Sequence, residues 1–163
     1  MKKGVLARIQ VGDLWGDVLE KIHREDLFRS EEEYTGGLEL QPHVTVLWGL
    51  EPTVHDDLLI RILESVQDLE VTFGEVNAFH QDEYDVLKYE VESEVLSELH
   101  DVLLHFPNSY EFDDFNPHMT IAYLKEGFSD RYEDTEFPDL GTRKVSRFDI
   151  SGPGDHSCCI RIL

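Results

Sequence analysis

Cysteine is nearly absent from this chain, and its scarcity excludes a disulfide scaffold. The 163 residues hold two cysteines, Cys158 and Cys159, which are adjacent in sequence. A disulfide between neighbouring residues is strained, so cross-links are not expected to stabilise the fold. A reducing cytoplasm is therefore the expected location.

Long hydrophobic runs are also missing. No apolar stretch approaches the ~20 residues of a membrane span, and residues 1–8 lack the apolar region of a signal peptide. Several enzyme motifs are absent too: a phosphate-binding P-loop, a dinucleotide fingerprint, a serine elbow and a Cys-x-x-Cys pair. We expect neither a membrane partner nor the enzyme classes that depend on these motifs.

Positive charge is scarce. Lysine and arginine number 14 against 35 acids, which gives a formal net charge of −21. Such a field repels long nucleic acid, although a small anionic ligand can still bind where donors are concentrated in a cleft. The acids are spread along the chain, which favours a solvated surface suited to a salty cytoplasm over a surface for a basic partner.

The main positive feature is a motif that occurs twice. Pro42–Leu50 recurs as Pro117–Lys125, and each copy reads Pro-His-x-Thr followed by apolar residues typical of a buried strand. Because side chains alternate along a strand, His43 shares a face with Thr45, as His118 does with Thr120. Two such strands side by side would surround one small space with two imidazoles and two hydroxyls.

These four side chains suit displacement at a phosphodiester without a metal or cofactor. An imidazole with a pKa of about 6.5 can accept or donate a proton near neutral pH, and a threonine hydroxyl can donate to a phosphoryl oxygen. The alternatives are strand-end histidines with a purely structural role, or a metal site. The doubled, proline-preceded pattern disfavours the first, and the lack of cysteine or carboxylate in a ligand pattern disfavours the second.

The stretches "PHVTVLWGL" and "PHMTIAYLKEG" resemble the 2H phosphoesterase superfamily, which includes the 2′-5′ RNA ligases and 2′,3′-cyclic phosphodiesterases. The resemblance implies a cleft between two similar lobes, with His43 and His118 as base and acid in an open order. Thr45 and Thr120 would orient and stabilise the phosphoryl oxygens. The match looks nearest to short phage members, including the anti-CBASS phosphodiesterases that linearise cyclic oligonucleotide signals.

The substrate implied by this resemblance is a small nucleotide, first of all a cyclic di- or trinucleotide in the cytoplasm of a phage host. Two alternatives stay open. One is a 2′,3′-cyclic phosphodiesterase or a 2′-5′ oligonucleotide hydrolase. The other is a catalytically idle protein that sequesters a nucleotide, or that mimics nucleic acid through its acidic face.

The expected architecture is one α+β domain over residues 1–163, with two lobes, antiparallel sheets, flanking helices and a central cleft. A helix before each motif strand indicates an internal repeat. Thr53 is expected to cap the second helix, and Ser93 the third. The expected strands cover 5–11, 43–50, 69–79, 86–91, 118–125, 145–150 and 158–163, and the helices cover 13–28 and the segments after Pro52 and Ser93.

Other residues are weaker candidates for the site. Lys125 ends the second motif strand and is expected either to bind a phosphate or to be an ordinary exposed lysine. Tyr34 lies in a polar loop where it could stack on a base, and Trp15 is expected in the core more readily than against a ligand. His80 is a candidate for the rim of the pocket. His100 and His105 are expected to face solvent.

Overall fold

The computed structural model describes residues 2–29 and 37–151, and the backbone of 158–161. The described strands form one antiparallel sheet in the order β1-β3-β6-β5-β4-β7-β8, in which β2 pairs with β6 and β7 also pairs with β1. The strands are β1 (Lys3–Ile9), β2 (Gly37–Leu38), β3 (His43–Leu50), β4 (Glu70–His80), β5 (Tyr84–Glu92), β6 (His118–Lys125), β7 (Thr142–Ser151) and β8 (Cys158–Arg161). The helices are α1 (Asp13–Glu20), α2 (Asp56–Glu64) and α3 (Glu94–Leu103), with 3₁₀ turns η1 (Arg24–Asp26) and η2 (Phe128–Tyr132).

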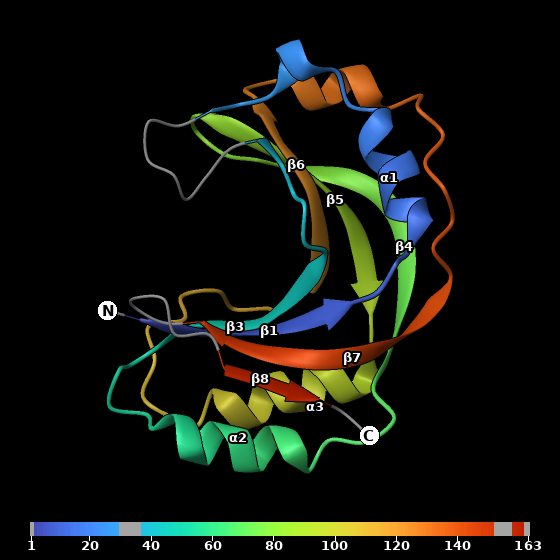
Figure 1. The fold of residues 1–163 in the computed structure, drawn as a ribbon. Coiled ribbons are helices and arrows are strands. Elements are labelled where there is room, and N and C mark those ends of the chain that lie inside the picture. The colour runs from blue at the N-terminus through green and yellow to red at the C-terminus, as the bar shows by residue number, and fades with distance from the viewer. Residues whose placement is uncertain (1, 30–36, 152–157, 162–163) are drawn as a thin grey trace.

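The sheet consists of two arms that meet along short junctions (Figure 1). The first arm is β3-β1-β7-β8 and the second is β2-β6-β5-β4. They join where Val44 of β3 pairs with Met119 of β6, and where the start of β4 pairs with the start of β7. The predicted α+β class is confirmed. The predicted separate sheets are instead one continuous sheet, because these two short ladders connect the arms.

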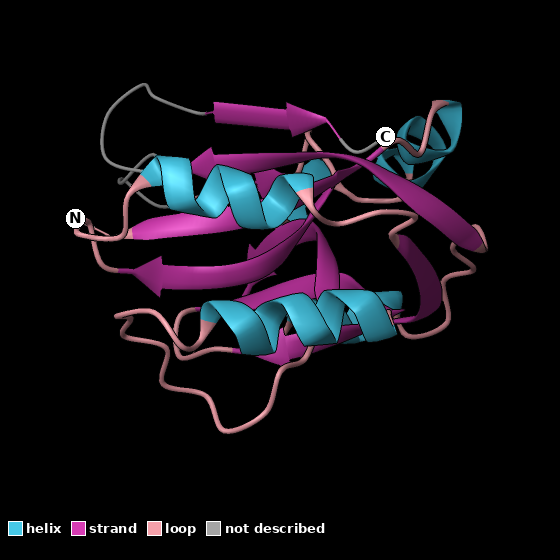
Figure 2. Cartoon of the chain, turned by 90° about the horizontal axis from the view of Figure 1, so that it is seen from below, coloured by secondary structure: helices cyan, strands magenta, loops and turns pink. Residues whose placement is uncertain are grey.

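Helices cover the outer side of this curved sheet. Figure 2 shows α2 and α3 side by side, and α3 contacts β3 although it follows β5 in the chain. The α3 face that turns inward carries Leu96, Leu99 and Leu103, and Ser93 caps the helix by accepting a hydrogen bond from the Leu96 amide at 3.2 Å, as predicted. None of the described helices is long and apolar enough to cross a membrane.

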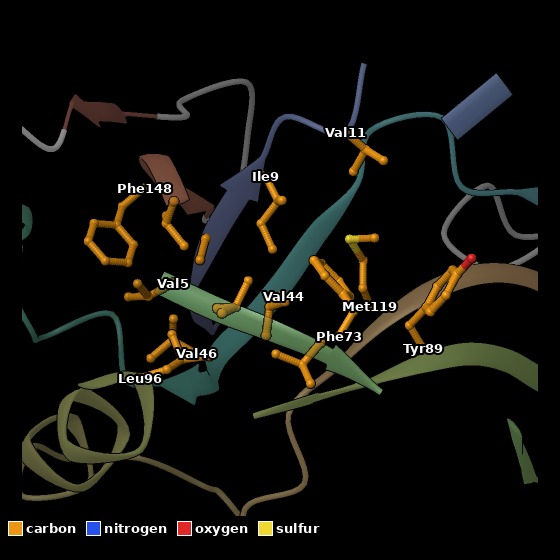
Figure 3. Packing of buried hydrophobic residues seen from close by; sticks show 14 of the residues in the cluster. Val5, Ile9, Val11, Val44, Val46, Phe73, Tyr89, Leu96, Met119 and Phe148 are labelled. Carbon is orange, nitrogen blue, oxygen red and sulfur yellow. The ribbon is translucent and has the colours of Figure 1, made fainter. Parts of the chain in front are cut away.

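The core lies between the sheet and the helices, and it explains the direction of the motif side chains. Val44, Val46 and Met119 are fully buried and belong to one cluster that runs through both arms (Figure 3). Burying one such side chain stabilises the fold by roughly 1.5–3 kcal/mol. Because Val44 and Met119 face the core, the flanking histidines and threonines must face the opposite side.

The helix predicted over residues 13–28 is shorter in the structure and ends at Glu20. The chain leaves the helix so that Asp26 can be buried, where it accepts hydrogen bonds from the Tyr132 hydroxyl at 2.8 Å and from Arg131 at 2.7 Å. A buried carboxylate needs such partners. The amphipathic pattern of 13–28 could not predict that Asp26 is buried, because both of its partners come from η2, about 100 residues later.

Two other predictions about local structure are wrong. Helix α2 begins at Asp56 with His55 at its N-cap and no side-chain cap, so Thr53 does not cap it. Lys3 fixes this helix start instead, because its ammonium donates to the Val54 carbonyl at 2.8 Å and to Asp56 at 2.7 Å. His100 was expected in solvent but is 2% exposed, since its Nδ1 donates to the Val46 carbonyl at 2.7 Å across the α3–β3 interface.

Candidate active site

The junction of β3 and β6 brings the two Pro-His-x-Thr motifs together. Because Val44 pairs with Met119 in an antiparallel register, His43 lies across from Thr120, and Thr45 lies across from His118. The two histidines therefore form a diagonal pair on one face of the sheet. Such diagonal neighbours have Cβ atoms about 7 Å apart, close enough for long side chains to meet around one phosphoryl group.

A row of polar side chains extends from this pair across six strands. Each neighbouring strand is antiparallel, so residues opposite one another share a face. In the order β7, β1, β3, β6, β5 and β4, the row consists of Arg147, Arg8, His43, Thr120, Lys88 and Asn77. A chain of net charge −21 thus gathers three cations beside its two motifs.

Both imidazoles are held in the same way. His43 Nδ1 lies 2.9 Å from the Gln41 carbonyl, and His118 Nδ1 lies 2.9 Å from the Asn116 carbonyl. A carbonyl can only accept, so each Nδ1 carries a proton and each Nε2 is the nitrogen left for chemistry. The motif prolines support this arrangement, because each one precedes its histidine at the start of a strand, where no amide donor is needed.

The ring of His118 lies in partly apolar surroundings. The edge of its ring packs on Phe79 with centroids 4.9 Å apart. Burial lowers the pKa of His118, and the nearby charges of Lys88 and His43 lower it further, while the hydrogen bond to Asn116 acts in the other direction. His118 is therefore held as the neutral imidazole near pH 7.

Lys88 lies beside the two motifs, a position that the sequence did not reveal. It is 5% exposed, lies opposite Thr120, and its ammonium sits 4.3 Å from the centre of the Phe79 ring. The ammonium donates to the Asn77 side chain, whose amide donates in turn to Glu90 at 2.6 Å. Burial lowers the pKa of Lys88, which Glu90 partly offsets. Along β5, Lys88 follows Tyr84 and Val86 at two-residue spacing, so the sequence could place these three side chains on one face. The pairing of β5 with β6 is what puts Lys88 next to Thr120.

A cavity of about 610 Å³ opens beside the motifs and is lined by Thr45, His118 and Thr120. Its walls are largely aromatic, and Trp48 and Phe112 are 52% and 74% exposed. Trp48 lies against Gly4, where a Cβ atom would overlap the indole. The aromatic residues that line the cavity are Trp48, Phe79, Tyr84, Tyr110, Phe112, Phe115 and Tyr123.

Buried His100 contacts two of the aromatic residues that line this cavity. Its ring stacks on Phe115 with centroids 4.0 Å apart and meets the edge of Tyr110 at 4.9 Å. Both rings belong to the segment before the second motif and line the cavity. A helix residue predicted to face solvent thus fixes the wall of the site.

Of the weaker candidates, those within the described residues do not line the cavity. Trp15 is 6% exposed and donates to the Glu39 carbonyl at 2.8 Å, so it is a core residue and not a stacking surface. Lys125 is exposed at the end of β6, with its ammonium 5.7 Å from the Phe128 ring, and it does not line the cavity. His80 bonds to Asp85 at 3.1 Å. Tyr34 lies outside the described residues.

Within the described part of the chain, no group of three His, Cys, Asp or Glu side chains is arranged to hold a metal ion. The structure brings together the two motif histidines, the two motif threonines and Lys88.

Residues 14–145 match the family model of the 2′-5′ RNA ligase superfamily, so the chain belongs to that superfamily. No curated protein sequence matched the chain.

Two solved structures share the fold. Usb1 of Kluyveromyces marxianus with uridine monophosphate is 11% identical, with a TM-score of 0.58 over 99% of this chain and 98% of that one. A second structure, described as a phosphoesterase, is 12% identical, with a TM-score of 0.52 over 99% of this chain and 95% of the other.

Proposed function

We propose that the protein is a phosphodiesterase that cleaves a small nucleotide without a metal, with His43 and His118 as its acid and base. The observation that carries the proposal is the diagonal placement of the two imidazoles. In each ring the Nδ1–H donates to a backbone carbonyl, which leaves Nε2 for proton transfer. Membership of the 2′-5′ RNA ligase superfamily supports phosphoester chemistry.

The proposed step is an in-line displacement at phosphorus. An oxygen nucleophile, water or a ribose hydroxyl, forms a bond to phosphorus as the bond to the leaving oxygen breaks. His118 accepts the proton of the nucleophile, and His43 donates a proton to the leaving oxygen. Thr45 and Thr120 donate hydrogen bonds to the non-bridging oxygens, where negative charge develops. Proton exchange with solvent restores both imidazoles.

The order of acid and base rests on the surroundings of the two rings. His118 is packed against Phe79 and lies beside the Lys88 charge, which favours its neutral form. A neutral imidazole is the form that accepts a proton. His43, the other imidazole of the diagonal pair, then takes the role of acid.

The proposed substrate is a cyclic di- or trinucleotide, as in the anti-CBASS phosphodiesterases of phages. A cavity of about 610 Å³ with aromatic walls suits a ligand with more than one base. Exposed Trp48 and Phe112 offer flat surfaces for stacking. The related fold of Usb1, solved with uridine monophosphate, supports a nucleotide in this class of site.

The test is incubation in EDTA with cyclic dinucleotides and trinucleotides, 2′-5′ oligoadenylate and 2′,3′-cyclic monophosphates. Chromatography should show a linear product from a cyclic oligonucleotide, and the His43→Ala/His118→Ala double variant should form none. Product from 2′,3′-cyclic monophosphates or 2′-5′ oligoadenylate alone would replace the proposed substrate. Ligand that is recovered bound but intact would replace catalysis with sequestration.

A further inference from the structure

A second cavity, of about 510 Å³, opens beside the start of the first motif strand. Its lining includes Arg8 and Arg147 from adjacent strands, together with Gln41 and Pro42. Along β3, His43 directly follows Pro42 and precedes Thr45, which lines the first cavity. Along the strand, the acid of the proposed reaction thus stands between a residue of the cationic cavity and a residue of the aromatic one.

The two arginines are fixed on the face that carries the motifs. Arg8 pairs with His43 on one side and with Arg147 on the other, while their neighbours Ala7, Val44 and Phe148 are fully buried on the opposite face. Strand spacing of about 4.8 Å places the two guanidinium-bearing positions one and two strands from His43. That is the distance range of the next phosphate along a nucleotide chain.

One buried carboxylate positions both side chains. Asp149 is 3% exposed and accepts hydrogen bonds from the Nε of Arg8 and, at 3.4 Å, from the Nη2 of Arg147. The Nε of Arg147 also lies 3.0 Å from Asp149 as an ion pair. Arg8 also donates from Nη1 to the Gln41 carbonyl at 3.1 Å, the carbonyl that accepts from His43. These bonds hold the two guanidinium planes in place.

The orientation leaves donors for a ligand. Arg147 donates to Asp149 from Nη2 at 3.4 Å, and its side chain is 43% exposed, so the outer edge of its guanidinium can turn to the cavity. A planar guanidinium matches two oxygens of a phosphate, and the carboxylate behind it reduces the conformational freedom that is lost on binding. Elsewhere in the row the third cation, Lys88, is buried under Phe79.

We propose that Arg8 and Arg147 form a binding site for a second phosphate, so that the substrate carries one phosphate at the histidines and another on the Arg147 side. This inference rests on the proposed function, because it assigns the scissile phosphate to His43 and His118. It selects oligonucleotides and cyclic dinucleotides, which have two phosphates, over cyclic mononucleotides, which have one.

Calorimetric titration tests the site without requiring turnover. The ligands are adenosine 3′,5′-bisphosphate and the two monophosphates, adenosine 3′-monophosphate and adenosine 5′-monophosphate. The wild-type protein should bind the bisphosphate about 10- to 100-fold more tightly than either monophosphate, the weight of a charge-assisted contact. Arg147→Met should remove most of this preference and leave monophosphate affinity within about twofold.

The matched control is Arg61→Met, which removes the same charge from the exposed face of α2 and should keep the full preference. Arg147→Gln is a second variant for the same comparison if the methionine variant has a lowered melting temperature. Equal affinity of the wild-type protein for bisphosphate and monophosphates overturns the site, as does a preference that survives both Arg147 substitutions. Preferential bisphosphate binding by a protein that cleaves no nucleotide contradicts the proposed function and leaves this site standing.

Discussion

His43 and His118 lie diagonally across the junction of β3 and β6, on the face of the sheet opposite Val44 and Met119. The two residues come from two copies of one motif that lie 75 residues apart in the sequence. Their proximity depends on a single pairing between the arms of the sheet. In each ring the Nδ1–H donates to the backbone carbonyl two residues earlier. The nitrogen left for chemistry is therefore Nε2 in both histidines.

Substitution of either histidine tests its role directly. His43→Ala or His118→Ala should lower kcat by about 10²- to 10⁴-fold, because each removes one proton-transfer group, while substrate affinity changes little. The measurement is steady-state hydrolysis of the substrate found in the nucleotide panel. His105→Ala is the control, since His105 is exposed and its Nδ1 donates to the Asp101 carbonyl of α3. Wild-type turnover by both motif variants would contradict the assignment.

Lys88 should control the acidic limb of the pH profile. The charged groups that face His118 are Lys88 and Glu90 from β5 and His43 from β3. Lys88 lowers the pKa of His118, so the base stays neutral to lower pH. Lys88→Met removes this cation, raises the pKa of His118, and should move the acidic limb of kcat/KM to higher pH.

Lys125→Met is the control for Lys88→Met. It removes a lysine from the exposed end of β6 and should leave the acidic limb in place. A limb that does not move in Lys88→Met, although the variant folds, would show that Lys88 acts only in packing.

The sequence predicted the strands and motifs well, because hydrophobic alternation and the repeated Pro-His-x-Thr pattern are local signals. It could not predict Lys88 or Arg8 as neighbours of the motifs, because each becomes one only through the pairing of distant strands. The same holds for His100, which follows the polar spacing of an exposed helix position yet is buried by a hydrogen bond to β3. Register and interfaces between arms are tertiary properties, and no short pattern along the chain encodes them.

Trp48 should contribute to binding and not to the chemical step. Its half-exposed indole lies on Gly4 and lines the aromatic cavity, so Trp48→Ala should raise the substrate Kd by about tenfold or more, the usual weight of one stacking contact. Gly4→Ala should reproduce part of this loss, since its Cβ displaces the ring. Leu58→Ala, at an exposed position on α2, is the control. Unchanged affinity in Trp48→Ala would exclude stacking on this residue.

Asp85 should set part of the acid stability of the fold. Burial acts to raise its pKa, but hydrogen bonds from the side chain and amide of Ser129 and from His80 hold the pKa below its ordinary value. A carboxyl with a lowered folded pKa stabilises the protein above its unfolded pKa of about 3.9 and loses this contribution as pH falls.

Ser129→Ala tests this contribution by urea unfolding. The variant should lose about 1–3 kcal/mol at pH 7, the cost of leaving a buried carboxylate short of a donor. The difference from wild type should shrink as pH falls through the lowered pKa of Asp85 in the folded protein, because the protonated carboxyl depends less on the donor. An equal loss at pH 7 and pH 3 would assign the effect to packing. Ser65→Ala, whose hydroxyl bonds within the exposed end of α2, is the matched control.

The pH dependence of kcat/KM in EDTA tests the central claim most directly, because it reports the acid and the base in the same measurement. The two-histidine mechanism predicts a bell-shaped profile with both limbs near neutrality, and an acidic limb below about pH 6.5, the ordinary histidine value, since the pKa of His118 is lowered. A profile that is flat between pH 5 and 9, or activity that disappears on chelation, would contradict it.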